Sequence, residues 1–115
     1  KIKRGDILAM ENSKLAFVEK DVEKAAVKLA KQMMKRDSSF ITIIYGEGVT
    51  AQEAEKVCEE VQKRAPKNAE VSVLEGNQPV YYYFISVEYF RQYVRTYLRV
   101  SPVFIFYRKT HCLSL

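Results

Sequence analysis

The sequence has little of the side-chain chemistry on which small enzymes and metal proteins depend. Tryptophan is absent, histidine occurs once and cysteine twice among 115 residues. His111 and Cys112 are neighbours in the chain, and neighbouring residues rarely both face one ion, while further ligands are not apparent. Cys58 falls on the apolar stripe of a predicted helix, which suits a small core residue. We therefore expect no catalytic site, no metal site and no cofactor.

Long apolar runs are missing as well. The sequence has no stretch of about eighteen apolar residues and no charged-then-apolar signal segment, so neither a membrane-spanning helix nor a secretory signal is predicted. The two cysteines form no CxxC pair, which fits a reducing compartment. We expect a cytoplasmic protein with one globular domain, and Lys1 in place of an initial Met indicates a piece of a longer chain.

Acidic residues are absent from the last part of the chain. Residues 1–88 carry fourteen Lys or Arg and fourteen Asp or Glu, whereas residues 89–115 carry five basic residues and no acid. The whole formal net charge of +5 therefore belongs to the end of the chain. We expect two parts, a module at residues 1–88 and a basic aromatic tail at residues 89–115.

A β-hairpin and a helix are predicted at the start of the chain. Residues 7–10 and 15–18 are short apolar runs on either side of the turn-forming residues 11–13, which is typical of a hairpin. Asp21 then precedes an apolar stripe with spacings of three and four residues. This pattern predicts an amphipathic helix with Asp21 as its N-cap, running to about Arg36.

A βαβ unit is predicted in the middle of the chain. Residues 40–45 are mostly β-branched or aromatic with almost no alternation, which is typical of a strand covered on both faces, and we place it at the sheet centre. Thr50 and Glu53 form a capping box at the start of a second amphipathic helix, and Pro66 lies just beyond its end. Residues 71–74 then form a second buried strand, parallel to the first.

The remaining pattern completes the fold class. Residues 75–79 turn the chain into a last strand, residues 80–87, which is dense in Tyr and Phe. The fold class is therefore α/β (α+β), a small mixed sheet of about five strands with two amphipathic helices packed on it, in the order β-β-α-β-α-β-β. In the tail, the spacing predicts a helix over residues 90–99, stopped at Ser101-Pro102, and then a short extended run at residues 103–107.

Five short segments carry a family resemblance. They are residues 3–6 (KRGD), 42–50 (TIIYGEGVT), 53–55 (EAE), 76–81 (GNQPVY) and 85–88 (ISVE). In this order and spacing they resemble the C-terminal module of the dihydroxyacetone-kinase-like proteins that serve as the ATP-binding subunit of bacterial fatty-acid kinase. The resemblance covers nearly all of the predicted module.

The resemblance implies docking rather than chemistry. In that family a separate N-terminal helical domain handles ATP and its metal, and the C-terminal module resembles one lobe of the DegV-type fold. The implied partner is the fatty-acid-binding, DegV-type protein, and a homodimer is a further alternative. Asn77 stands where the family often has a second Gly, and the family pattern usually stops at about residues 85–88, so the tail has no counterpart in it.

The first candidate site is the turn between the strand at residues 40–45 and the second helix. Gly46, Glu47, Gly48 and Thr50 place backbone N–H groups at a helix N-terminus, where a phosphate or carboxylate can bind. This supports an alternative function, a small-molecule domain for an anion or acyl head group. We favour a tight turn with a capped helix, because Glu47 repels an anion and no P-loop lysine follows.

The second candidate site is the turn before the tyrosine-rich strand together with that strand. On one interpretation these residues only turn the chain, since Gly and Asn tolerate left-handed conformations and Pro suits an edge strand. On the other, a glutamine and aromatic side chains anchor a partner, as aromatic residues dominate interface hot spots. The candidate residues are Gly76, Asn77, Gln78, Pro79, Tyr81 and Tyr83.

The tail has the only composition that suits nucleic acid or an anionic membrane. Arg with interleaved Tyr and Phe can stack on bases and contact phosphates. We favour another origin, a readthrough or frameshifted extension, because Lys/Arg usage changes abruptly where the family pattern ends. Neither nucleic acid nor a membrane is therefore an expected partner of the module itself.

Overall fold

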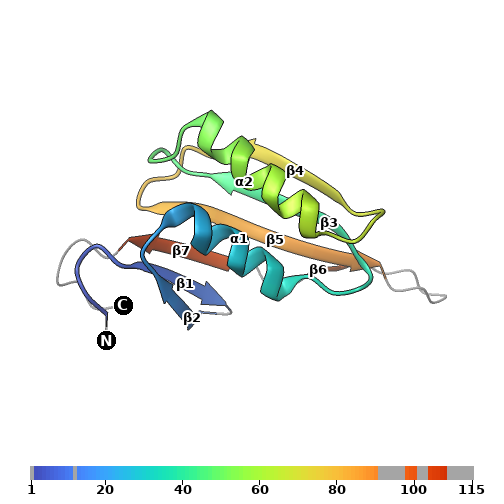
Figure 1. Ribbon diagram of the computed structural model, residues 1–115, viewed down its shortest axis with the longest axis horizontal. Helices are drawn as coiled ribbons and strands as arrows, with labels where there is room; N and C mark the ends of the chain where they lie inside the picture. The colour runs from blue at the N-terminus through green and yellow to red at the C-terminus, as the bar shows by residue number, and fades with distance from the viewer. Residues whose placement is uncertain (1, 12, 91–97, 101–103, 109–115) are drawn as a thin grey trace.

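The computed structural model describes residues 2–11, 13–90, 98–100 and 104–108 (Figure 1). Within these residues, two helices and seven strands follow one another in the order β-β-α-β-α-β-β-β-β. They are β1 (Ile7–Glu11), β2 (Lys14–Glu19), α1 (Val22–Met33), β3 (Ser38–Tyr45), α2 (Ala51–Arg64), β4 (Glu70–Glu75), β5 (Tyr81–Phe90), β6 (Leu98–Val100) and β7 (Phe104–Arg108).

All described strands belong to one mixed sheet in the order β2-β1-β7-β5-β3-β4, with β6 paired to β5. Strands β3 and β4 are parallel, as expected for a βαβ unit, and the other pairs are antiparallel. Both helices lie on the same face of this sheet (Figure 1). The predicted fold class is confirmed for the module, and the tail adds two strands to its sheet.

The chain begins with a turn that fixes the first strand. The Asp6 N–H donates to the Lys3 carbonyl oxygen at 3.0 Å, and the Lys3 N–H donates to the Asp6 side chain at 2.8 Å. Gly5 between them has φ 92°, a left-handed conformation that glycine adopts without steric cost. The β1–β2 hairpin follows, with Ser13 at φ 66° in its turn.

Both helices start at the residues that the sequence predicts. The Asp21 side chain accepts the Lys24 N–H at 2.9 Å, and Thr50 and Glu53 form a complete capping box. Helix α1 ends at Met33, earlier than predicted, because Met34 is extended with φ −73° and ψ 140° and leads the chain into β3.

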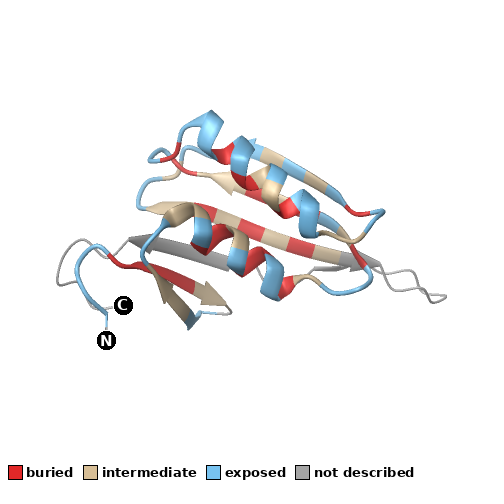
Figure 2. Cartoon of the chain, in the orientation of Figure 1, coloured by how far each residue is buried: buried red, intermediate tan, exposed pale blue. Residues whose placement is uncertain are grey.

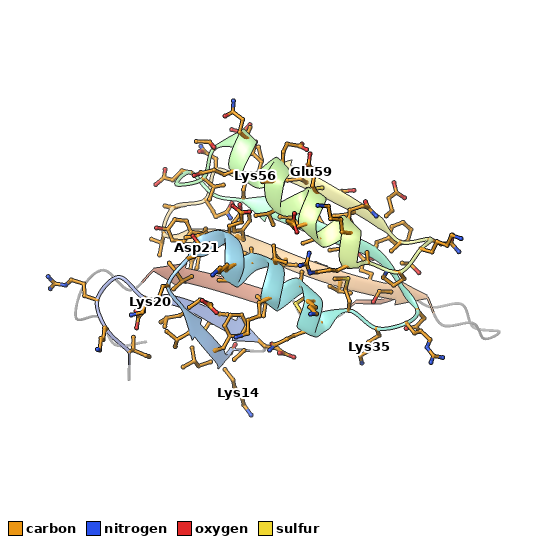
Figure 3. The ribbon with its side chains drawn as sticks, in the orientation of Figure 1. Lys14, Lys20, Asp21, Lys35, Lys56 and Glu59 are labelled. Atoms are coloured by element: carbon orange, nitrogen blue, oxygen red, sulfur yellow. The ribbon has the colours of Figure 1, made fainter. Side chains whose placement is uncertain are left out.

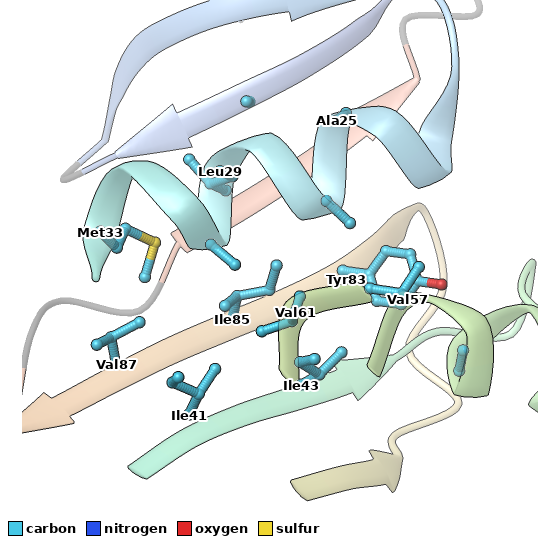
Figure 4. Close-up of a cluster of buried hydrophobic side chains, with 14 of the residues drawn as sticks. Ala25, Leu29, Met33, Ile41, Ile43, Val57, Val61, Tyr83, Ile85 and Val87 are labelled. Atoms are coloured by element: carbon cyan, nitrogen blue, oxygen red, sulfur yellow. The ribbon is translucent and has the colours of Figure 1, made fainter. Parts of the chain in front are cut away.

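The core lies between the sheet and the two helices (Figure 4). Leu29 of α1, Val57 of α2, Ile43 of β3 and Ile85 of β5 belong to this core, and all four side chains are fully buried. Aliphatic side chains of this size contribute roughly 1.5–3 kcal/mol each when fully buried, so this layer stabilises the fold.

Three expectations for the strands of the βαβ unit are wrong. Strand β3 is covered by helices on one face only, and Phe40 on the other face is 42% exposed. Strand β4 is the edge of the sheet and not a buried strand, with Leu74 53% exposed (Figure 2). A strand made almost entirely of apolar residues can therefore have one face exposed to solvent. An apolar side chain on that face merely fails to gain the free energy of burial. Strand β3 also lies one position from the edge rather than at the sheet centre.

The helix predicted over residues 90–99 is wrong at both of its ends. Phe90 belongs to β5 and residues 98–100 form β6, while residues 91–97 lie outside the described residues. The predicted extended run corresponds to β7, which is a strand. The unpaired backbone groups at the edge of β5 offer hydrogen bonds that outweigh a weak helical preference.

Candidate functional site

The turn after β3 is held against the segment that precedes β5. The Gly46 N–H donates to the Tyr82 carbonyl oxygen at 2.8 Å, and the Glu47 N–H donates to the Gln78 carbonyl oxygen at 2.9 Å. A Cβ at position 46 would overlap the Tyr81 carbonyl oxygen and lie 2.7 Å from that of Gln78. Only glycine allows this approach of two backbone segments.

The turn after β4 reaches the same place from the other side. The Gly76 and Asn77 N–H groups both donate to the Tyr45 carbonyl oxygen, at 2.8 and 3.2 Å. The Gln78 side-chain amide donates to the Ile44 carbonyl oxygen at 3.3 Å. The structure therefore brings the two candidate turns together at the carboxyl ends of the parallel strands β3 and β4.

Val80 is a feature of this site that the sequence did not reveal. It has φ 74°, an unfavourable conformation for a β-branched residue, and its side chain is 67% exposed. The Tyr81 N–H donates to the Pro79 carbonyl oxygen at 2.7 Å, which closes a strained three-residue turn around it. Such strain costs about 1–3 kcal/mol and tends to occur at functional sites. The sequence predicted only the start of a strand here.

The candidate tyrosines have different environments. The Tyr81 ring packs beside the Phe84 ring, with centroids 5.6 Å apart. Tyr83 is 1% exposed and points from β5 toward the helices (Figure 4), which places it with the core side chains rather than on a contact surface. Burial, and then the charges of Glu53 and Glu23, raise the pKa of Tyr83 well above its usual value.

A cavity of about 360 Å³ lies beside this site, where both helices begin. Figure 3 shows two of its residues, Lys20 and Asp21, in the turn that leads into α1. Carboxylates outnumber basic groups among the lining residues, which opposes anion binding. They are Lys20, Asp21, Val22, Glu23, Gly48, Val49, Glu53, Tyr82 and Tyr83.

Two backbone donors near this cavity already have partners. The Val49 N–H donates to the Gly46 carbonyl oxygen at 3.2 Å, and the Thr50 N–H donates to the Glu53 carboxylate at 2.9 Å. The Lys20 ammonium lies 3.3 Å from the Asp6 carboxylate. These contacts support the interpretation of residues 46–50 as a tight turn with a capped helix.

A second hollow, of about 510 Å³, runs between the two helices. Its walls are the solvated charged faces of α1 and α2, where Arg64 donates to Glu60 at 2.9 Å and Lys63 donates to Glu60 at 3.2 Å. The Arg64 and Lys63 hydrogen bonds lower the pKa of Glu60. Acidic and basic side chains are mixed along this hollow, so it favours neither anionic nor cationic ligands.

Metal-ligating and nucleophilic groups are not gathered in the described part of the chain. Within it, no group of three or more His, Cys, Asp or Glu side chains could hold a metal ion. Cys58 is half-buried on α2, and burial raises the pKa of its thiol, with smaller contributions from Glu55 and Glu59. His111 and Cys112 lie outside the described residues.

No described helix is both long enough and apolar enough to cross a membrane. The longer of the two, α2, has fourteen residues and carries charged side chains on its outer face, including Lys56 and Glu59 (Figure 3). A membrane-spanning helix needs about 20 consecutive apolar residues.

Comparison with known sequences places the chain in a family. A mixed sheet with two helices on one face and a pair of joined turns at its edge defines a small α/β module. Residues 1–88 match the FakA-like C-terminal family, which is described as the C-terminal part of a fatty acid kinase subunit. The chain therefore belongs to the FakA-like family of fatty acid kinase proteins, of which it carries the C-terminal module.

Two relatives come from different bacterial genera. An uncharacterised protein of Staphylococcus haemolyticus is 34% identical over 87 residues, which is 76% of this chain and 16% of the relative. Protein YloV of Bacillus subtilis is 32% identical over 87 residues, with the same shares of each chain. The chain thus spans about a sixth of the length of the relatives it matches.

Proposed function

We propose that this chain is a non-catalytic interaction module of the ATP-binding subunit of a fatty-acid kinase, which docks the DegV-type protein that carries the fatty acid. Family membership supports the kinase assignment. One geometric observation supports docking. The Glu47 N–H donates to the Gln78 carbonyl oxygen, and this backbone hydrogen bond joins the turns at residues 46–50 and 76–80 into one edge. We call this edge, with Val80 and Tyr81, the docking edge.

The docking edge has the properties of a preorganised contact surface. Val80 projects an exposed apolar side chain from a strained turn, and the aromatic pair Tyr81–Phe84 lies next to it. Exposed apolar and aromatic groups are the usual anchors of interfaces. Because Gly46 and Gln78 hold the turns in place, little conformational entropy is lost when a partner binds.

The non-catalytic role is part of this proposal and rests on the family resemblance, in which a separate domain handles ATP and its metal. The docking edge holds the carboxylate of Glu47 but no side chain that pairs with it as an acid or base. We therefore assign ATP and its metal to another part of the longer protein, and we propose a cytoplasmic location and no cofactor for this module. The boundary between module and tail near residue 88 is part of the same proposal.

Calorimetric titration of the chain with a DegV-type fatty-acid-binding protein tests this function. We expect wild-type binding, and at least a tenfold weaker affinity for Val80→Asp, which corresponds to about 1.4 kcal/mol. Leu15→Asp is the matched control, since Leu15 is 46% exposed on β2, away from the docking edge. No binding by the folded chain, or equal losses in both variants, would contradict the proposal. Sedimentation of the chain alone measures whether it forms a homodimer.

A further inference from the structure

Strand β7 occupies the space between two edges of the family module. It is antiparallel to β1 on one side, with Ala9 opposite Phe106, and antiparallel to β5 on the other, with Tyr83 opposite Phe106 (Figure 1). The family match ends at residue 88, whereas β7 is residues Phe104–Arg108. The strand that joins the two halves of the sheet therefore comes from outside the family module.

Strands β6 and β7 pair with the same strand in nearly continuous register. Phe90 is opposite Leu98 in the β5–β6 pair, and Ile85 is opposite Phe104 in the β5–β7 pair. Together they form the return arm of a long hairpin with β5. Every strand pairing recorded at this side of β5 is thus made by the tail.

Without that arm, β1 and β5 face each other as two edges with room for one strand. Among the described strands, β1 pairs with β2 and β7 only, and β5 pairs with β3, β6 and β7. Neighbouring strands lie about 4.8 Å apart, so the gap between β1 and β5 is one strand wide. Unpaired strand edges are templates for an added strand.

The walls of this slot define the chemistry of its occupant. On β1, Ile7 and Ala9 are fully buried, and on β5, Ile85 is fully buried and Tyr83 nearly so. Helix α1 packs against both strands and covers one face of the slot. A strand that fills the slot needs apolar residues at the positions in register with Ala9, Tyr83 and Ile85. In β7, Phe106 is opposite both Ala9 and Tyr83, and Phe104 is opposite Ile85, while Arg108 is opposite Ile7 at the end of the slot.

We propose that β1 and β5 form an acceptor slot for one extended apolar strand of a partner protein, and that residues 104–108 fill this slot in cis. Strand addition of this kind derives its affinity from main-chain hydrogen bonds and its specificity from alternate side chains. The tail and the partner strand then compete for one site. Only the identity of the partner rests on the proposed function.

Hydrogen exchange on the full chain tests the slot with a peptide probe. Ile105→Pro removes a backbone donor from β7, and we expect amide exchange at residues 7–10 and 81–85 to become at least about tenfold faster, while β3 keeps its protection. A synthetic peptide with the sequence of residues 103–109, VFIFYRK, should restore that protection. Ile105→Val keeps the donor and the β-branched side chain, so it is the matched control.

Three outcomes would overturn the proposal. Protection at residues 7–10 that persists in Ile105→Pro means that β7 does not fill the slot, and failure of the peptide to restore lost protection means that the slot accepts no strand from another chain. A mass that doubles with concentration identifies a second copy as the occupant rather than a partner. If Ile105→Pro does not fold, Phe104→Pro at the first residue of β7 gives the same test. Peptide binding without binding of the DegV-type protein would reject the proposed function alone.

Discussion

The side-chain amide of Gln78 donates a hydrogen bond to the Ile44 carbonyl oxygen at 3.3 Å, and so ties the turn after β4 to the last residues of β3 across 34 positions of sequence. We expect Gln78→Met, which removes this donor, to lower the free energy of unfolding by about 1 kcal/mol. Gln52→Met is the control, because Gln52 is exposed at the start of α2. Urea denaturation of both variants measures the difference, and equal stabilities would show that the hydrogen bond contributes nothing.

Gly46 should tolerate no side chain. Gly46→Ala places a methyl group against the backbone carbonyl oxygens of Tyr81 and Gln78, neither of which can move without breaking the joined turns. We expect a loss of about 1–3 kcal/mol in the free energy of unfolding. In Gly48→Ala the new methyl group meets only the Tyr82 ring, at 3.3 Å, which can shift. Thermal melts in which both variants lose the same stability would refute this distinction.

The two faces of the sheet should respond differently to truncation of apolar side chains. Ile43 is fully buried between β3 and the helices, so Ile43→Ala should cost about 2–5 kcal/mol. Leu74 on the open face is 53% exposed, and Leu74→Ala should cost less than about 1 kcal/mol. Urea denaturation midpoints test this order, and a larger loss in Leu74→Ala would mean that the open face is covered in solution.

Asp6 should make stability depend on pH in the acid range. The Lys3 backbone N–H, and then the Lys20 ammonium, lower the pKa of Asp6 in the folded chain. Its contribution is therefore present above the unfolded pKa, about 4, and is lost as the pH falls through the folded value.

The comparison of wild type with Asp6→Asn checks this dependence. We expect the stability difference between them to be largest near neutral pH and to shrink as the pH falls through the folded-state pKa of Asp6, because the protonated carboxyl group is uncharged like the amide that replaces it. Glu47→Gln, in the exposed turn after β3, is the control. A wild-type advantage that is independent of pH would show that packing, and not the charge of Asp6, is responsible.

Local patterns predicted much of the module. The caps at Asp21 and Thr50, the hairpin turn and the βαβ unit are confirmed because each depends on neighbouring residues. The contact between the two candidate turns could not be predicted, since it joins Glu47 and Gln78 through backbone atoms that no side-chain pattern encodes. The positive φ of Val80 runs against the preference of its residue type, so no sequence signal announces it.

The tail shows why helical periodicity alone was misleading. Its spacing of Phe90, Val94 and Leu98 predicted a helix, yet Phe90 and Leu98 are opposite each other in a strand pair. Pairing with the neighbouring edge of β5 determines the conformation of this segment. That edge exists only once the sheet has formed, so local spacing does not reveal it. Residues 98–100 are extended because extension lets their backbone groups pair with those of β5.

The place of β7 between β1 and β5 has a consequence for the order of folding. The parallel β3–β4 pair joins residues about 30 positions apart through α2, whereas Ile7 is opposite Arg108 at the far end of the chain. Closure of the longer loop costs more entropy, so we expect the βαβ unit to form first and the outer edge of β1 to be completed last. Pulse-labelled hydrogen exchange during refolding measures this order, and simultaneous protection of both regions would contradict it. During synthesis, β1 leaves the ribosome well before β7, so its second neighbour arrives only after the two helices and the other strands of the module have been made.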